Sequence, residues 1–181
     1  MEVITIKDKS FRISIPEADI LTAIDRVASR INTDLAGQIP LFLCVLNGSF
    51  MFAGDLMKRV SIECEISFVK LASYHGGMSS SGSVKQLIGL NTDLSGRAVV
   101  IVEDIVDTGN TIESLVSQIN ALNPSSVQVC TLLYKPEAYT KSIPVDYVAL
   151  EVPNLFLVGY GLDYDELGRN LKDIYVLHEA D

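Results

Sequence analysis

The sequence predicts an α/β fold in which a mostly parallel, twisted sheet is flanked by helices. Two observations support this prediction. Short runs of apolar and β-branched residues, typical of buried strands, recur along the chain. Between them lie longer segments whose apolar residues repeat at helical spacing. Strands that alternate with helices form a mainly parallel sheet with helices on both faces.

The first part of the chain contains two short predicted strands, 4–6 and 11–15, joined by a polar turn. A helix is expected to begin at Pro16, because proline is favoured at a helix start and acidic residues follow it. Its apolar positions are Ile20, Leu21, Ile24, Val27, Ala28 and Ile31. A buried strand at 41–46 and a helix at about 50–60 come next.

A hairpin is predicted in the middle of the chain. Residues 62–71 are strand-like, and 84–90 return as a second strand that we expect to lie outside the central sheet. Glycine and serine dominate residues 73–83, and such a backbone is costly to order. The residues alone leave two interpretations open: a hairpin tip without a function, or a lid over a site.

The segment 98–112 is the most informative part of the chain. Its apolar run predicts a strand buried on both faces, and two adjacent carboxylates, Glu103 and Asp104, follow where the strand ends. Asp107 and then Thr108-Gly109-Asn110-Thr111 come next. A helix follows, with apolar positions at Ile112, Leu115, Val116, Ile119 and Leu122.

This arrangement suits a phosphorylated sugar and a metal ion. A loop of small residues that enters a helix presents unpaired backbone N–H groups to an anion. Thr108 and Thr111 add hydroxyl donors, and Gly109 permits close approach. The three carboxylates would repel a phosphate, so we expect them to face sugar hydroxyls, a hard cation or a transferred proton. A merely acidic helix start would explain neither their number nor the apolar strand before them.

Further strands are predicted at 127–133, 146–150, 156–158 and 174–177. Ligands of such sheets bind at the carboxyl ends of the strands. Three segments each follow a predicted strand: Asn47-Gly48, the segment 103–107 that we call the acidic loop, and Lys135. The topology therefore predicts that they converge.

Length and composition favour one domain, residues 1–181, because this length and a hydrophobic content of 48% support a single core. A chain without a membrane-length apolar run or a signal-like start is expected to be cytoplasmic, with no membrane partner. The net charge of −9 argues against nucleic-acid binding. It does not exclude an anionic substrate, since exposed charges are screened beyond roughly 8 Å. Cys44, Cys64 and Cys130 are expected to be small buried hydrophobic residues.

Residues 103–111 resemble the phosphoribosyl-diphosphate signature of the type I phosphoribosyltransferases: Glu-Asp, two residues, Asp-Thr-Gly, one residue, Thr. Further motifs appear in the order found in the hypoxanthine-guanine branch of that family. They are Leu46-Asn47-Gly48-Ser49-Phe50, Ser73-Tyr74, Lys135-Pro136, the segment 156–164 and Arg169. The resemblance covers about 41–177. It implies a type I phosphoribosyltransferase-like fold of bacterial type, with a small hood from the N- and C-terminal segments and a flexible lid loop at about 73–84.

The resemblance also implies an activity in purine salvage. The phosphoribosyl group of 5-phosphoribosyl 1-diphosphate would be transferred to N9 of hypoxanthine, and of guanine, with release of pyrophosphate and dependence on Mg²⁺. It further implies a homodimer or homotetramer. Two alternatives stay open: a xanthine- or guanine-preferring enzyme, and a non-catalytic regulator that uses the same fold to sense nucleotides.

Roles for individual residues follow from the same resemblance. Asp107 is the expected catalytic residue, facing N7 of the purine. The ribose and 5′-phosphate would be bound by Glu103, Asp104, Asp107, Thr108, Gly109, Asn110 and Thr111. The purine would be bound by Lys135, Phe156, Leu157 and Asp163. The pyrophosphate would be bound by Asn47, Gly48 and Arg169, and the metal by Glu103, Asp104 and Asp163. Ser73 and Tyr74 belong to the implied lid.

Three of these residues have ordinary interpretations when the family is ignored. Lys135 and Arg169 would be surface residues, and Phe156 a core residue. In the family's terms, Lys135 selects a 6-oxopurine, Phe156 stacks on the base and the Leu157 backbone contacts the edge of the base. Asn47 departs from the family, in which many members have a basic residue, so Mg²⁺ and Arg169 are expected to carry more of the pyrophosphate charge.

Overall fold

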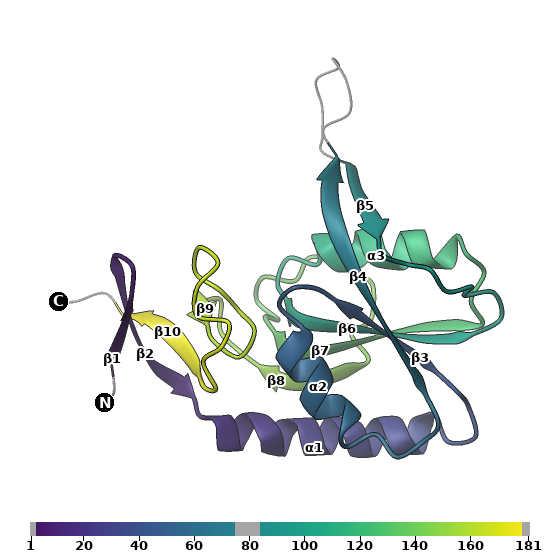
Figure 1. Cartoon of the computed structure of the whole chain (residues 1–181), viewed down its shortest axis with the longest axis horizontal. Coiled ribbons are helices and arrows are strands. Elements are labelled where there is room, and N and C mark those ends of the chain that lie inside the picture. The colour runs from purple at the N-terminus through teal and green to yellow at the C-terminus, as the bar shows by residue number, and fades with distance from the viewer. Residues whose placement is uncertain (1–2, 75–83, 179–181) are drawn as a thin grey trace.

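The computed structural model describes residues 3–74 and 84–178 of the chain, in two sheets with three helices among these residues (Figure 1). The larger sheet consists, in spatial order, of β5 (Val84–Ile88), β4 (Glu65–Tyr74), β3 (Leu41–Val45), β6 (Ala98–Val106), β7 (Ser126–Tyr134) and β8 (Tyr147–Glu151). The five strands from β4 to β8 are parallel, as predicted.

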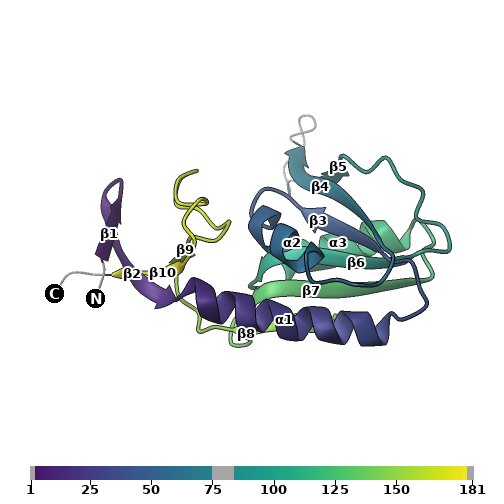
Figure 2. The ribbon, with the colours of Figure 1, turned by 60° about the horizontal axis from the view of Figure 1, so that its bottom comes forward.

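Helices cover both faces of the larger sheet. Helices α1 (Glu17–Asp34) and α2 (Phe50–Met57) pack on one face, and α3 (Asn110–Asn120) packs on the other (Figures 1 and 2). Each face of the sheet has its own hydrophobic core, and successive residues of β3 point into opposite cores. Phe42 packs in the core with α1 and α2, and Leu43 packs in the core with α3. Because every β3 residue is buried, the strand is apolar throughout.

The hairpin differs from its prediction in one respect. Strand β5 is an antiparallel edge strand of the larger sheet, so the expectation that it lies outside that sheet is wrong. Residues 65–69 of β4 pair with β3, whereas 70–74 pair with β5. Strand β4 therefore extends beyond its pairing with β3, and β5 pairs with this extension. Residues 75–83 of the predicted lid lie outside the described residues.

A smaller antiparallel sheet unites the two ends of the chain. Its order is β1 (Val3–Ile6), β2 (Lys9–Ile15), β10 (Ile174–His178) and β9 (Leu157–Val158). It lies beyond the start of α1, beside the larger sheet, as Figure 2 shows. It has a core of its own around Phe11, Val158 and Tyr175.

The start of α1 is tied to the smaller sheet. The backbone N–H of Glu17 donates to Asp173 Oδ1 at 2.7 Å, and Asp173 is buried just before β10. A carboxylate at a helix N-terminus satisfies an otherwise unpaired donor. This contact fixes the smaller sheet relative to the helix that supports the larger one.

Two further expectations concern the cysteines and the membrane. Cys44 and Cys130 are free and buried, as predicted, while Cys64 is free and half-buried. Within residues 3–74 and 84–178, no helix combines the length and the apolar character needed to cross a membrane.

Candidate active site

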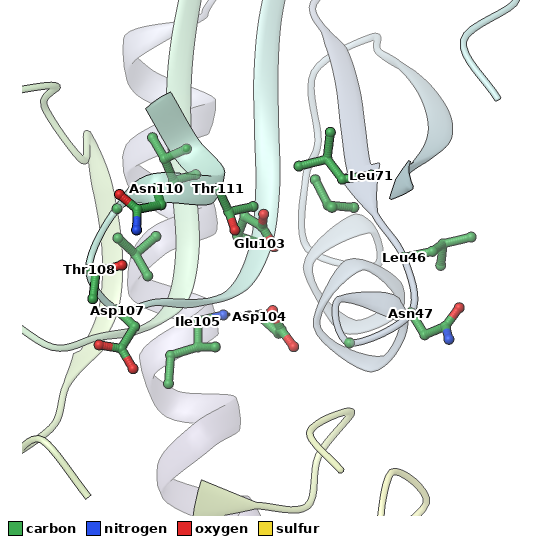
Figure 3. A pocket seen from close by; sticks show the side chains of 15 residues that line it. Leu46, Asn47, Leu71, Glu103, Asp104, Ile105, Asp107, Thr108, Asn110 and Thr111 are labelled. Carbon is green, nitrogen blue, oxygen red and sulfur yellow. Dashed lines mark hydrogen bonds between the residues drawn. The ribbon is translucent and has the colours of Figure 1, made fainter. Parts of the chain in front are cut away.

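A cavity of about 370 Å³ opens at the carboxyl ends of β3 and β6. It is lined by residues 45–48, Leu71 and residues 103–112 (Figure 3). The acidic loop and the Asn47-Gly48 loop therefore meet, as the topology predicted.

The turn from β6 into α3 forms the anion-binding half of this cavity. Gly109 precedes the first residue of α3 and has a φ of 87°, which glycine adopts without strain. A Cβ at Gly109 would also lie 2.5 Å from the Tyr139 ring and 2.6 Å from Lys141 Cγ. The first N–H groups of a helix have no acceptor within it, so those of α3 are available to a phosphate.

The carboxylates form the other half. Glu103 is buried, and Asp104 is half-buried with its Oδ1 accepting a 2.9 Å hydrogen bond from Ile105 N. Burial raises the pKa of Asp104, although that bond and the charge of Arg169 oppose the shift. Figure 3 shows Asp104 toward the Asn47 side of the cavity and Asp107 toward the Thr108 side.

Gly48 is in direct contact with the acidic loop. A Cβ at Gly48 would lie 1.6 Å from Asp104 Oδ2, so only glycine fits there without displacing the carboxylate. The peptide bond before Asn47 is cis, and the Asn47 side chain points away from the carboxylates (Figure 3). The backbone of this loop, rather than its side chain, therefore faces the acids.

Arg169 lies on a loop that packs against Gly48. Its Nη1 donates to Gly161 O at 2.9 Å, and its Nη2 lies 2.8 Å from Asp163 Oδ1. A Cβ at Gly161 would lie only 2.0 Å from Gly48 O. The structure thus brings the three predicted pyrophosphate residues Asn47, Gly48 and Arg169 into one region. Gly161 was not among the predicted site residues. Its φ of 100° lies in the left-handed region, which explains why a glycine occupies this position.

Lys135 follows β7 and is not a surface residue. Its side chain is 9% exposed, and Nζ lies 2.9 Å from Asp107 Oδ2 and 3.4 Å from Asn154 Oδ1. A buried ammonium needs such partners. Asn154 was not among the predicted site residues, because only the return of the chain after β8 brings it to Lys135.

Phe156 and Leu157 belong to the edge of the smaller sheet. Leu157 is buried in β9, whereas Phe156 is 46% exposed and therefore not a core residue. The Phe156 ring lies 5.9 Å from the Tyr164 ring, edge to face, and 6.3 Å from that of Phe11. An exposed ring held by aromatic neighbours can stack on a flat ligand.

The donor set at the cavity fits a hard cation. Glu103 and Asp104 offer carboxylate oxygens, and Asp163 is engaged by Arg169 and by the N–H of Glu166 at 2.8 Å. In the described part of the chain, no three His, Cys, Asp or Glu side chains form a ready-made metal cluster. This is compatible with Mg²⁺, which uses one or two carboxylates and completes its shell with substrate oxygens and water.

The fold and site together define an α/β protein whose cavity is suited to a phosphorylated sugar. Residues 16–165 match the model of the phosphoribosyl transferase domain, and the chain belongs to this family of enzymes.

Its relatives include proteins named as hypoxanthine-guanine phosphoribosyltransferases. A hypoxanthine-guanine phosphoribosyltransferase of Streptococcus thermophilus is 42% identical over 93% of both chains. The corresponding enzyme of Streptococcus agalactiae is 42% identical over 90% of this chain and 91% of its own length. The crystal structure of a hypoxanthine phosphoribosyltransferase from Staphylococcus aureus has a TM-score of 0.84 and 36% identity, covering 92% of this chain and 91% of that one.

Proposed function

We propose that this chain transfers the phosphoribosyl group of 5-phosphoribosyl 1-diphosphate to N9 of hypoxanthine or guanine, forming the nucleotide and pyrophosphate. The observation that carries the proposal is one cavity that combines the turn before α3, the carboxylates at the carboxyl end of β6 and the Gly48 backbone. The names of the relatives support the choice of a 6-oxopurine as acceptor.

The sugar phosphate binds along the segment from Glu103 to Thr111. The N–H groups and hydroxyls of Thr108, Gly109, Asn110 and Thr111 hold the 5′-phosphate, because this turn presents donors to an anion. Glu103 and Asp104 accept hydrogen bonds from the ribose hydroxyls, directly or through a cation.

The leaving pyrophosphate is held by the backbone of Asn47 and Gly48 and by Arg169. Arginine suits this role because its planar guanidinium binds phosphate oxygens in pairs. Glu103, Asp104 and Asp163 are the residues that would hold Mg²⁺, and the chemistry that the ion would supply is neutralisation of charge on the diphosphate. Position 47 is an asparagine and offers no positive charge, whereas Arg169 bonds to Gly161, which contacts Gly48.

The purine lies between Phe156 and the Lys135–Asp107 pair. Lys135 Nζ donates to O6 of the base, and the Leu157 backbone contacts the edge of the base. As N9 attacks the anomeric carbon and the bond to pyrophosphate breaks, the Asp107 carboxylate accepts the proton at N7. Residues Ser73 and Tyr74, whose backbone ends β4, belong to a segment that closes over the site and excludes water.

We further propose that the enzyme is a cytoplasmic homodimer or homotetramer. Phe50, Ile66 and Phe68 are 43–45% exposed on α2 and β4, and an apolar surface of this kind suits a subunit contact. Free buried thiols accord with a reducing compartment. Light scattering coupled to size-exclusion chromatography measures the assembly, and a monomer at micromolar concentration would contradict it.

One assay tests the main proposal. The protein, 5-phosphoribosyl 1-diphosphate and Mg²⁺ are incubated with hypoxanthine, guanine, xanthine or adenine, and nucleotide formation is followed by absorbance. Turnover of hypoxanthine and guanine, with little of adenine, is expected. Preference for xanthine would identify the alternative enzyme. No nucleotide from any base, with tight nucleotide binding, would indicate the non-catalytic regulator.

A further inference from the structure

Tyr160 forms a buried link between two loops of the candidate active site. It lies between β9 and Arg169, is 1% exposed and donates through its hydroxyl to Asp55 Oδ2 at 2.5 Å. Asp55 lies on α2, the helix that begins directly after the Asn47-Gly48 loop. Neither residue lines the cavity.

Each partner is joined to one side of the proposed pyrophosphate site. On the side of Tyr160, Gly161 N donates to Arg169 O at 2.9 Å, and Gly161 O accepts from Arg169 Nη1 at the same distance. On the side of Asp55, α2 leads back to Gly48, whose carbonyl is in contact with Gly161. The hydrogen bond therefore closes a ring of contacts that passes through both loops.

The charge states of the pair favour a lasting bond. Burial and the neighbouring Asp55 raise the pKa of Tyr160, so the phenol remains a donor. Burial alone would raise the pKa of Asp55, but hydrogen bonds from Lys58 and Tyr160, with the charges of Lys58 and Arg59, lower it. A neutral phenol that donates to a carboxylate in a buried place is a strong, charge-assisted hydrogen bond.

We propose that Tyr160 and Asp55 are positioning residues that hold the Arg169 loop against the Gly48 loop at the separation that a diphosphate requires. This inference rests on the proposed function. A bond that only stabilised the fold would affect both substrates equally. A positioning bond affects the diphosphate more than the purine, because only the diphosphate spans the two loops.

The variant Tyr160→Phe removes the hydroxyl and keeps the ring. We expect the KM for 5-phosphoribosyl 1-diphosphate and the inhibition constant of pyrophosphate to rise about 5- to 30-fold. This factor corresponds to the binding free energy that one hydrogen bond contributes. The KM for hypoxanthine should stay within about twofold. Tyr147→Phe is the matched control: Tyr147 is also 1% exposed, and its hydroxyl accepts from Gln128 Nε2 at 3.3 Å, away from the cavity. It should leave both KM values unchanged.

Changes at Asp55 provide a second test if Tyr160→Phe folds poorly. Asp55→Asn keeps an oxygen that accepts from Tyr160 and should retain most of the affinity for the diphosphate. Asp55→Ala also removes the contacts with Lys58 and Arg59, so its loss should be at least that of Tyr160→Phe. Adding Tyr160→Phe to Asp55→Ala should cost nothing more, because the bond between the two residues is already absent.

The outcomes separate this inference from the proposed function. If the wild type forms nucleotide but Tyr160→Phe changes both KM values equally, or neither, the inference is overturned and the function stands. If the wild type forms no nucleotide, the function fails. Calorimetric binding of pyrophosphate with Mg²⁺ then decides the inference: equal affinity in the wild type and Tyr160→Phe overturns it, and weaker binding in Tyr160→Phe supports it.

Discussion

Lys135 Nζ lies 2.9 Å from Asp107 Oδ2, and the lysine side chain is 9% exposed while the carboxylate is 45% exposed. The cation proposed to recognise the purine and the acid proposed to accept its proton are thus already an ion pair. Because the lysine is the buried partner, it depends on the pair more than Asp107 does. Base recognition and proton transfer are consequently coupled in one contact.

Lys135→Met should weaken selection of 6-oxopurines. The variant removes a charged donor, and such a hydrogen bond contributes about 1.5–3 kcal/mol. We expect kcat/KM for hypoxanthine to fall about 10- to 100-fold, while that for adenine changes little or rises. Steady-state kinetics with both bases measure the ratio. Lys172→Met, at a lysine whose side chain is 69% exposed, is the control. An unchanged hypoxanthine-to-adenine ratio in Lys135→Met would remove Lys135 from base recognition.

Asp107→Asn should slow turnover without unfolding the protein. Loss of a general base lowers kcat about 10²- to 10⁴-fold. The half-exposed amide can still accept from Lys135, but the buried ammonium loses its charged partner, so the free energy of unfolding should fall by about 1–3 kcal/mol while the protein stays folded. Urea denaturation and initial rates check the two parts separately. A wild-type rate would show that Asp107 is not the base.

Local sequence patterns predicted the strand, the turn and the helix of residues 98–112, although β6 continues through Glu103 and Asp104 to Val106 instead of ending before them. The strand, the carboxylates and the turn into α3 are consecutive, so their chemistry is visible in residues 98–112. The burial of Lys135 is different: its local sequence favours a surface position, and only packing against Asp107 and Asn154 encloses it. Pairs such as Tyr160 and Asp55 are more than 100 residues apart, and nothing local indicates that they meet.

Gly48→Ala should disturb donor binding specifically. The added methyl group would lie 1.6 Å from Asp104 Oδ2, so either the carboxylate or the loop must move. A displacement of about 1 Å in an active site can lower the rate about 10²-fold, and we expect that loss in kcat/KM for 5-phosphoribosyl 1-diphosphate. Gly54→Ala on α2 is the matched control, because no atom lies within 4 Å of its added Cβ. It should raise stability by about 0.4–1 kcal/mol and leave the kinetics unchanged.

Asp104→Asn should make the ligand-free protein more stable at neutral pH while weakening its function. Burial raises the pKa of Asp104, so the folded protein holds this proton more tightly than the unfolded chain does. As the pH rises from below the ordinary value of 3.8 through the raised pKa, the wild type loses stability that the uncharged amide retains. The amide oxygen still accepts from Ile105 N, so the backbone contact survives.

Thermal unfolding of both proteins from acidic to neutral pH tests this linkage. The Tm of Asp104→Asn should exceed that of the wild type at neutral pH, and the difference should shrink as the pH approaches the ordinary value. Asp93→Asn is the control, since exposed Asp93 also accepts a backbone hydrogen bond, from Ser95 N at 3.0 Å, and should show no such gain. Affinity for 5-phosphoribosyl 1-diphosphate should fall about tenfold in Asp104→Asn, or about 1.4 kcal/mol. A lower Tm at neutral pH would contradict the argument, because it would mean that the folded protein stabilises the charged carboxylate.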